Sequence, residues 1–170
     1  ISGSVKEADL NLQLAKWVQS LNDDPAIQVI LTRKEDSKMT QEERTQLCKQ
    51  MRADLFISLH MNSAGSEIHK GIEVYTASKV VSENNRILAS TLINSLKDIY
   101  GTTPVIKQRK EEIYVLDKSP CPSALIECGF ITNPSDLAFV SDPANQQKIA
   151  KGILQAVREF SLRRVAETRV

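Results

Sequence analysis

The stretch ADLFISLHMN, residues 53–62, decides the expected fold of this chain. Five of the seven residues from 55 to 61 are apolar, and such a run is typical of a strand buried on both faces. The run brings His60 to the carboxyl end of the strand, where a polar turn with Gly65 follows. In open α/β sheets ligands bind at the carboxyl ends of the strands, and neutral imidazole is the commonest metal ligand. His60 is therefore a candidate ligand, with a core histidine bonded to a backbone carbonyl as the plain alternative.

Length and composition indicate one soluble globular domain over residues 1–170. The chain has 41% hydrophobic and 25% charged residues, which is ordinary for such a domain with a substantial core. A net charge of +1 gives no electrostatic footprint for nucleic acid, and no apolar run reaches the roughly 18 residues of a membrane span. Three cysteines without metal-type spacing do not suggest a disulfide framework. The chain opens at Ile1 rather than at a methionine, so we expect it to be a piece of a longer protein.

Helices and strands alternate along the chain. Thr40 and Glu43 form a capping box, and Asn133-Pro134 and Asp142-Pro143 are typical helix starts. Together with the spacing of apolar residues, these signals predict helices over about 7–21, 40–52 and 82–100, a short helix from 133, and a last helix from 142 to about 160. Strands are predicted over 27–32, 55–60, 71–76, 113–116 and 123–127. The alternation indicates an α/β fold, a three-layer αβα sandwich with a mostly parallel central sheet covered by helices on both faces.

Three candidate catalytic side chains gather at one edge of this sheet. His60 and Glu127 both end strands, and right-handed crossovers place the carboxyl ends of successive strands on the same edge. Glu7 follows a loop at the start of the first helix and can join them, although a carboxylate there also simply complements the helix dipole. One imidazole and two carboxylates suggest zinc hydrolysis, because catalytic zinc takes His and Glu ligands and a further carboxylate can act as general base. The plain alternative for Glu127 is an ion pair with a nearby Arg or Lys.

These residues resemble the catalytic domain of zinc-dependent N-acetylmuramoyl-L-alanine amidases, the type found in cell-wall amidases and many phage endolysins. Four segments carry the resemblance: VKEADLNL at 5–12, VILTRKED at 29–36, ADLFISLHMN at 53–62 and ALIECGFITNP at 124–134. The likeness runs from about residue 4 to residue 160. The two later segments are long and stand in the family's order, which makes the match specific.

The resemblance implies a role for each candidate residue. Glu7 and His60 would bind zinc, and Glu127 would act as general base for the attacking water and as proton donor to the leaving amine. Arg44 and Asn62 would help to position the substrate. The implied reaction cleaves the amide between N-acetylmuramic acid and L-alanine of the peptidoglycan stem peptide. The resemblance also implies a cell-envelope location, periplasmic or extracellular, peptidoglycan as the partner, and a monomer.

One departure from the family concerns the first zinc histidine. The family carries it in an Asp-x-Gly-His-Gly loop after its first strand, ahead of the position of Glu7, and this sequence has no such loop. We therefore expect the first strand and the first metal-ligand loop to precede Ile1, with His69 as a weak candidate for the missing ligand. Two alternatives stay open: a catalytically impaired peptidoglycan-binding or sensor module with an incomplete zinc site, and a cysteine hydrolase using Cys128 with His60. Glu127 beside Cys128 disfavours the second, because it would raise the pKa of the thiol.

Overall fold

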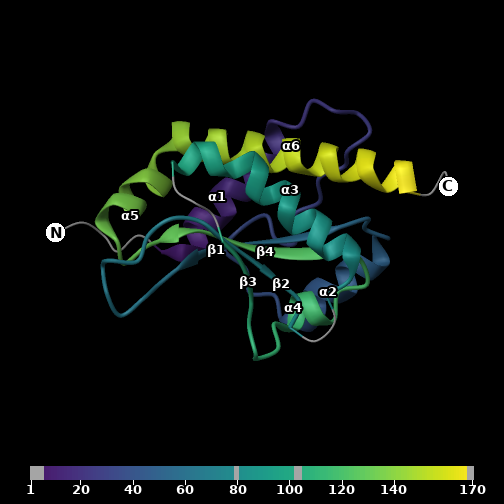
Figure 1. The fold of residues 1–170 in the computed structure, drawn as a ribbon, viewed down its shortest axis with the longest axis horizontal. Helices are drawn as coiled ribbons and strands as arrows, with labels where there is room; N and C mark the ends of the chain where they lie inside the picture. Colours follow the sequence, from purple (N-terminus) through teal and green to yellow (C-terminus); the bar gives the residue numbers. More distant parts are fainter. Residues whose placement is uncertain (1–5, 79–80, 102–104, 168–170) are drawn as a thin grey trace.

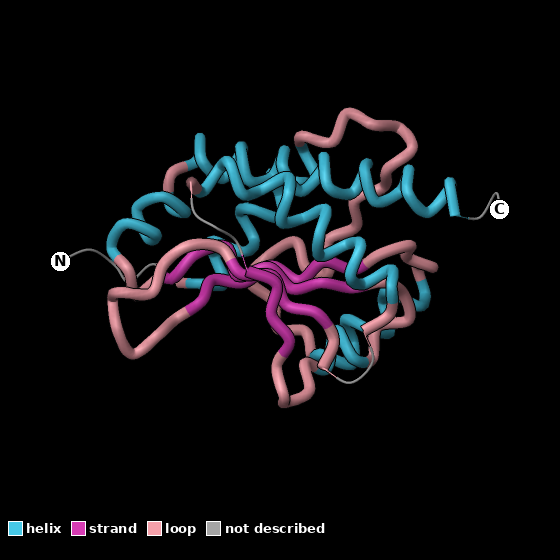
Figure 2. The backbone as a smooth tube through the Cα atoms, in the orientation of Figure 1, coloured by secondary structure: helices cyan, strands magenta, loops and turns pink. Residues whose placement is uncertain are grey.

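The computed structural model describes residues 6–78, 81–101 and 105–167, with side chains as far as Arg163. Within them, one four-stranded sheet lies between two layers of helices (Figures 1 and 2). The strands stand in the order β1-β4-β2-β3. Their bounds are Phe56–Asn62 for β1, Glu73–Thr76 for β2, Val105–Gln108 for β3 and Ser123–Phe130 for β4. The expected three-layer α/β fold is confirmed.

Strand direction decides which residues share the edge of the sheet. β1 runs parallel to β4 and β2 runs parallel to β3, whereas β2 and β4 are antiparallel. Two of these three pairings are parallel, as expected for a mostly parallel sheet. His60 stands opposite Glu127 in the β1–β4 pair, and Glu73 stands opposite Glu127 in the β2–β4 pair. The antiparallel step therefore puts the beginning of β2, not its carboxyl end, at the edge where β1 and β4 end.

The helices divide between the two faces of the sheet (Figure 1). One face carries α1 (Glu7–Ser20), α3 (Glu83–Tyr100) and α6 (Pro143–Glu167), with α5 (Pro134–Ser141) beside them. The other face carries α2 (Gln41–Gln50) and α4 (Tyr114–Asp117). Thr40 starts α2 through the expected capping box: its side chain accepts from the Glu43 N–H, and Glu43 accepts from the Thr40 N–H. None of the described helices is both long and apolar enough to span a membrane.

Two hydrophobic clusters hold the layers together. The larger lies under α1, α3 and α6, and its fully buried members include Leu14, Leu88, Leu92, Ile126, Ile149 and Ile153. The smaller lies under α2 and α4 and contains Phe56 and Leu125. Because side chains alternate along a strand, His60 and Glu127 project from the same face as Phe56 and Leu125. The candidate site therefore lies on the α2–α4 side of the sheet.

Most of the predicted elements are present. The predicted helices correspond to α1, α2, α3, α5 and α6, and the strands predicted over 55–60, 71–76 and 123–127 correspond to β1, β2 and β4. β1 and β4 continue to Asn62 and Phe130, so the prediction that His60 and Glu127 end their strands is wrong.

The strand predicted over 27–32 is wrong. No strand runs beside it in the described part of the chain, so Val29 is only half-buried and Ile30 is 39% exposed. β1 is correspondingly the outer strand of the described sheet, and Ile57 and Leu59 in its middle are only half-buried. The expectation that this strand is buried on both faces therefore fails, because the outer flank of β1 lacks a described neighbour.

The strand predicted over 113–116 is also wrong, since this segment forms the helix α4. Asp117 decides the outcome: its carboxylate accepts hydrogen bonds from the Ile113 N–H at 2.8 Å and from the Ser78 N–H at 2.8 Å, which closes a helical turn and ties it to the end of β2. The structure adds β3, which sequence patterns did not predict. Val105 and Ile106 in that strand are nearly half-exposed, so β3 lacks the apolar run of a buried strand.

Candidate active site

Glu7 and His60 meet beside the end of β1. Glu7 is the first residue of α1, and its Oε1 lies 3.0 Å from His60 Nδ1. The same oxygen accepts hydrogen bonds from the backbone N–H of Met61 at 3.2 Å and from the side-chain amide of Asn11 at 3.1 Å. The bond with His60 is the largest cause that lowers the pKa of the Glu7 carboxyl, and it outweighs partial burial. On the other side of the ring, Ser58 Oγ lies 3.1 Å from His60 Nε2.

Glu127 lies next to His60 on the neighbouring strand and is far more buried. Its side chain is 9% exposed, and burial raises the pKa of its carboxyl. The charges of His60 and Arg109 act in the opposite direction, while Glu7 and Glu73 add to the rise. Glu127 Oε1 lies 3.9 Å from Arg109 Nη2, and Oε2 is buried without a hydrogen-bond partner among the described residues. So loose an ion pair does not satisfy the carboxylate and leaves Oε2 free to accept a proton.

The donor atoms of Glu7 and His60 suit a zinc ion. Zinc binds imidazole nitrogen and carboxylate oxygen at about 2.0–2.2 Å, so two ligands of a tetrahedral centre stand about 3.3 Å apart. The 3.0 Å between His60 Nδ1 and Glu7 Oε1 is close to that spacing. No group of three His, Cys, Asp or Glu residues that could hold a metal occurs in the described part of the chain. His69, the weak candidate, is exposed and stacks on Phe130 with 5.9 Å between ring centroids.

Of the two residues expected to position substrate, Asn62 lies at the site and Arg44 has its contacts elsewhere. Asn62 ends β1, and its side-chain amide donates to Glu73 Oε2 at 3.2 Å. Arg44, on α2, donates to Thr32 Oγ1 at 3.1 Å and to the Met39 carbonyl at 3.3 Å. Its described hydrogen bonds therefore fix the loop that precedes α2, and the structure does not bring it to Glu127.

Sequence reasoning missed a polar network on the far side of Glu127. Glu73 accepts hydrogen bonds from Lys107 Nζ at 2.5 Å and from the Tyr75 hydroxyl at 2.7 Å. Arg109 follows β3 and lies over the Tyr75 ring, with Cζ 4.7 Å from the ring centroid. In the sequence, Glu73 occupies a polar position of an alternating strand pattern, which is typical of a solvent-facing side chain. Only the order of the strands in the sheet reveals that Glu73 is a neighbour of Glu127.

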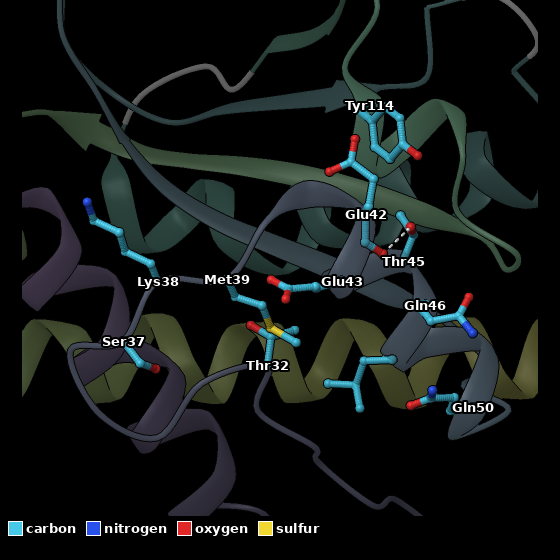
Figure 3. A pocket seen from close by; sticks show the side chains of 11 residues that line it. Thr32, Ser37, Lys38, Met39, Glu42, Glu43, Thr45, Gln46, Gln50 and Tyr114 are labelled. Carbon is cyan, nitrogen blue, oxygen red and sulfur yellow. Dashed lines mark hydrogen bonds between the residues drawn. The ribbon is translucent and has the colours of Figure 1, made fainter.

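A groove of about 730 Å³ lies along α2, away from these residues (Figure 3). Its lining includes Thr32, Lys38, Met39, Glu42, Gln46 and Tyr114. None of Glu7, His60 and Glu127 lines it. The groove is therefore separate from the catalytic candidates.

The structure excludes Cys128 as a nucleophile. It is fully buried in the larger hydrophobic cluster, on the opposite face of β4 from Glu127. Burial, with the charge of Glu127 as a second cause, raises the pKa of its thiol. Since the thiolate is the reactive form, this cysteine is inert at neutral pH.

A buried carboxylate beside an imidazole–carboxylate pair, on two neighbouring parallel strands, is typical of a metal-dependent hydrolase. Residues 1–159 match the family described as N-acetylmuramoyl-L-alanine amidase, and the chain belongs to this family. It is a peptidoglycan hydrolase that cleaves the amide between N-acetylmuramic acid and L-alanine, and it acts at the cell envelope or outside the cell.

The chain is similar to three further proteins, two of which are named as amidases. The chain is 32% identical over 160 residues to the uncharacterized protein YqiI of Bacillus subtilis, with 94% of this chain and 77% of that protein covered. It is 32% identical over 154 residues to the amidase LytC of the same organism, with 90% of this chain and 31% of LytC covered. The catalytic domain of the amidase CwlV from Bacillus (Paenibacillus) polymyxa var. colistinus superposes with a TM-score of 0.83 at 27% identity, with 94% and 90% of the two chains covered.

Proposed function

We propose that the hydrolysis uses a zinc ion held by Glu7 and His60, with Glu127 as general base and then general acid. The observation that supports this assignment is the alignment of His60 with Glu127 across the β1–β4 pair, with Glu7 bonded to His60 Nδ1. It brings two metal donors and one free carboxylate oxygen to the same edge of the sheet. When bound, zinc supplies Lewis acidity toward the scissile carbonyl and lowers the pKa of water at the site.

Glu127 carries the proton in this mechanism. Its carboxylate takes a proton from the attacking water as the new C–O bond forms at the lactyl carbonyl. It returns that proton to the alanine nitrogen as the C–N bond breaks, which releases the stem peptide as an amine. The buried Oε2, without a partner among the described residues, is the acceptor available for this transfer. Asn62, held by Glu73, orients the substrate beside it, and Arg44 acts on the substrate only through the loop it braces.

We assign the third zinc ligand to chain outside the described residues. The outer edge of β1 has no strand partner in the described part of the chain, and the segment 27–32 leaves Val29 half-buried and Ile30 39% exposed. A further strand at this edge would pair with β1 and end beside His60, where a histidine could complete the site. The 170-residue chain alone is therefore expected to bind zinc weakly, since loss of even an outer-sphere partner costs roughly 10–100-fold in affinity.

The location follows from the substrate. Peptidoglycan lies outside the cytoplasm, so the enzyme works in the periplasm or outside the cell.

The test measures zinc content and release of peptides from peptidoglycan side by side, in the full-length protein. His60→Ala and Glu7→Gln are expected to lose both zinc and activity. Glu83→Gln, an exposed carboxylate in the first turn of another helix, is the matched control and should keep both. Unchanged zinc content in the first two variants refutes the ligand assignment. A protein that binds peptidoglycan but never releases peptide would be the binding or sensor module instead.

A further inference from the structure

Arg109 differs from the other cation of the polar network. Lys107 is committed to Glu73 at 2.5 Å, and Glu73 is further bonded by Tyr75 and Asn62, so this carboxylate is neutralised and satisfied. Among the described residues, Arg109 approaches Glu127 at 3.9 Å and contacts Tyr75, and its side chain is 48% exposed. A guanidinium has five N–H donors in a planar fork, so these two contacts leave donors available for a ligand.

The position of Arg109 is nevertheless fixed. Its Cζ lies 4.7 Å from the centroid of the Tyr75 ring, within the range of a cation–π contact. Tyr75 in turn is buried in the smaller hydrophobic cluster, and its hydroxyl is bonded to Glu73. Arg109 therefore presents its donors beside Glu127 from a rigid support, which lowers the entropic cost of binding an anion.

The order of the strands gives the site a direction. Glu7 and His60 lie on the β1 side of Glu127, and Arg109 lies on the β2–β3 side. Because Glu127 returns its proton to the leaving amine, the acyl and sugar part of the substrate belongs on the side of Glu7 and His60. The departing peptide then extends past Glu127 toward Arg109.

We propose that Arg109 binds a carboxylate of the stem peptide on the residue that follows L-alanine. This inference rests on the proposed role of Glu127. In peptidoglycan that residue is a glutamate joined through its γ-carboxyl, so its α-carboxyl is either free or amidated. Arginine binds a carboxylate through two parallel hydrogen bonds, whereas an amide loses the charge and one acceptor. Arg109 thereby sets a preference for stem peptides with a free α-carboxylate.

The experiment compares two muramoyl peptides that differ only in a free or amidated α-carboxyl on the second residue. The full-length enzyme is expected to cleave the free form with a kcat/KM roughly ten- to a hundredfold higher, as for a charged hydrogen-bonded pair. Arg109→Gln should raise KM for the free form much more than for the amidated form, so that the preference is lost. Arg109→Lys should restore part of it, and the exposed neighbour Lys110→Gln should change nothing.

Two results would overturn the inference. If the enzyme cleaves both substrates with the same kcat/KM, Arg109 does not bind the α-carboxylate. A loss in kcat that is equal for both substrates in Arg109→Gln makes Arg109 a positioning residue for Glu127 instead. Measuring the affinity of the enzyme for the released peptides, free and amidated, separates this inference from the amidase assignment. A difference in affinity that depends on Arg109 supports the role of Arg109 even if no turnover is seen. Equal affinities refute that role.

Discussion

Glu127→Gln separates proton transfer from metal binding and from folding. Glutamine has the shape of glutamate and fills the same space on β4, where the side chain is only 9% exposed. It cannot accept a proton from water at neutral pH. General acid–base catalysis contributes roughly 10²–10⁴ in rate, or about 2.7–5.4 kcal/mol in the barrier, so kcat should fall by that factor.

Folding should survive the same change. Burial raises the pKa of the Glu127 carboxyl, which means that the folded protein holds its ionised form at a cost. The neutral amide of glutamine removes the cost of burying a charge. It also removes the loose ion pair with Arg109, but Arg109 is half-exposed and is still held by the Tyr75 ring. The variant is therefore expected to be at least as stable as the parent in urea unfolding at neutral pH.

The assay measures zinc content, urea unfolding and peptide release for the full-length parent and for two variants, Glu127→Gln and Glu73→Gln. Glu73 is the matched control, since it is a carboxylate in the same row across the sheet but is bonded to Lys107. Its loss should cost less than about tenfold in rate, because it reaches the substrate only through Asn62. If Glu127→Gln empties the zinc site, Glu127 is a ligand and the mechanism is wrong. If it cuts peptidoglycan at nearly the parent rate, Glu127 is structural.

Three further predictions concern the framework of the site. Gly152→Ala should destabilise the protein by roughly 1–2 kcal/mol in urea unfolding, because the added methyl lies 2.8 Å from a leucine methyl of α3, while Gly65→Ala, with nothing within 4 Å, should change little. Burial raises the pKa of the Tyr100 hydroxyl well above its usual value, so the free energy of unfolding should fall above about pH 10, where the phenol ionises in the unfolded chain. Tyr100→Phe loses the hydrogen bond to the Cys128 carbonyl and should lower the free energy of unfolding by about 1 kcal/mol at neutral pH. At about pH 10.5 the difference in stability between this variant and the parent should be smaller. Burial also raises the pKa of the Cys48 thiol to about 11, so iodoacetamide should leave Cys48 and Cys128 unlabelled at neutral pH. Treatment with iodoacetamide should therefore leave the amidase activity unchanged. Rapid inactivation would favour the alternative of a cysteine hydrolase.

The sequence predicted those parts of the fold that local chemistry decides. The capping box at Thr40 and the apolar run that ends at His60 are short-range signals, and both elements formed where expected. Segments 27–32 and 113–116 carried similar apolar runs and were wrongly predicted as strands. The first has no described strand beside it, and Asp117 closes the second into a helical turn. A strand needs a partner across the sheet, and short apolar runs do not reveal whether one exists.

Glu73 and Glu127 show which part of the candidate site could not be predicted from the sequence. Each is a carboxylate in a strand, and both lie in the same row as His60. Their chemistry differs only through their neighbours: Lys107, which β3 supplies, neutralises Glu73, while Glu127 keeps an oxygen without a described partner. No periodic signal predicted β3, and none predicted that β2 would run antiparallel to β4. The sequence could point to a carboxylate in a buried strand, but the pairing of strands far apart in the chain decides which carboxylate remains free to take a proton.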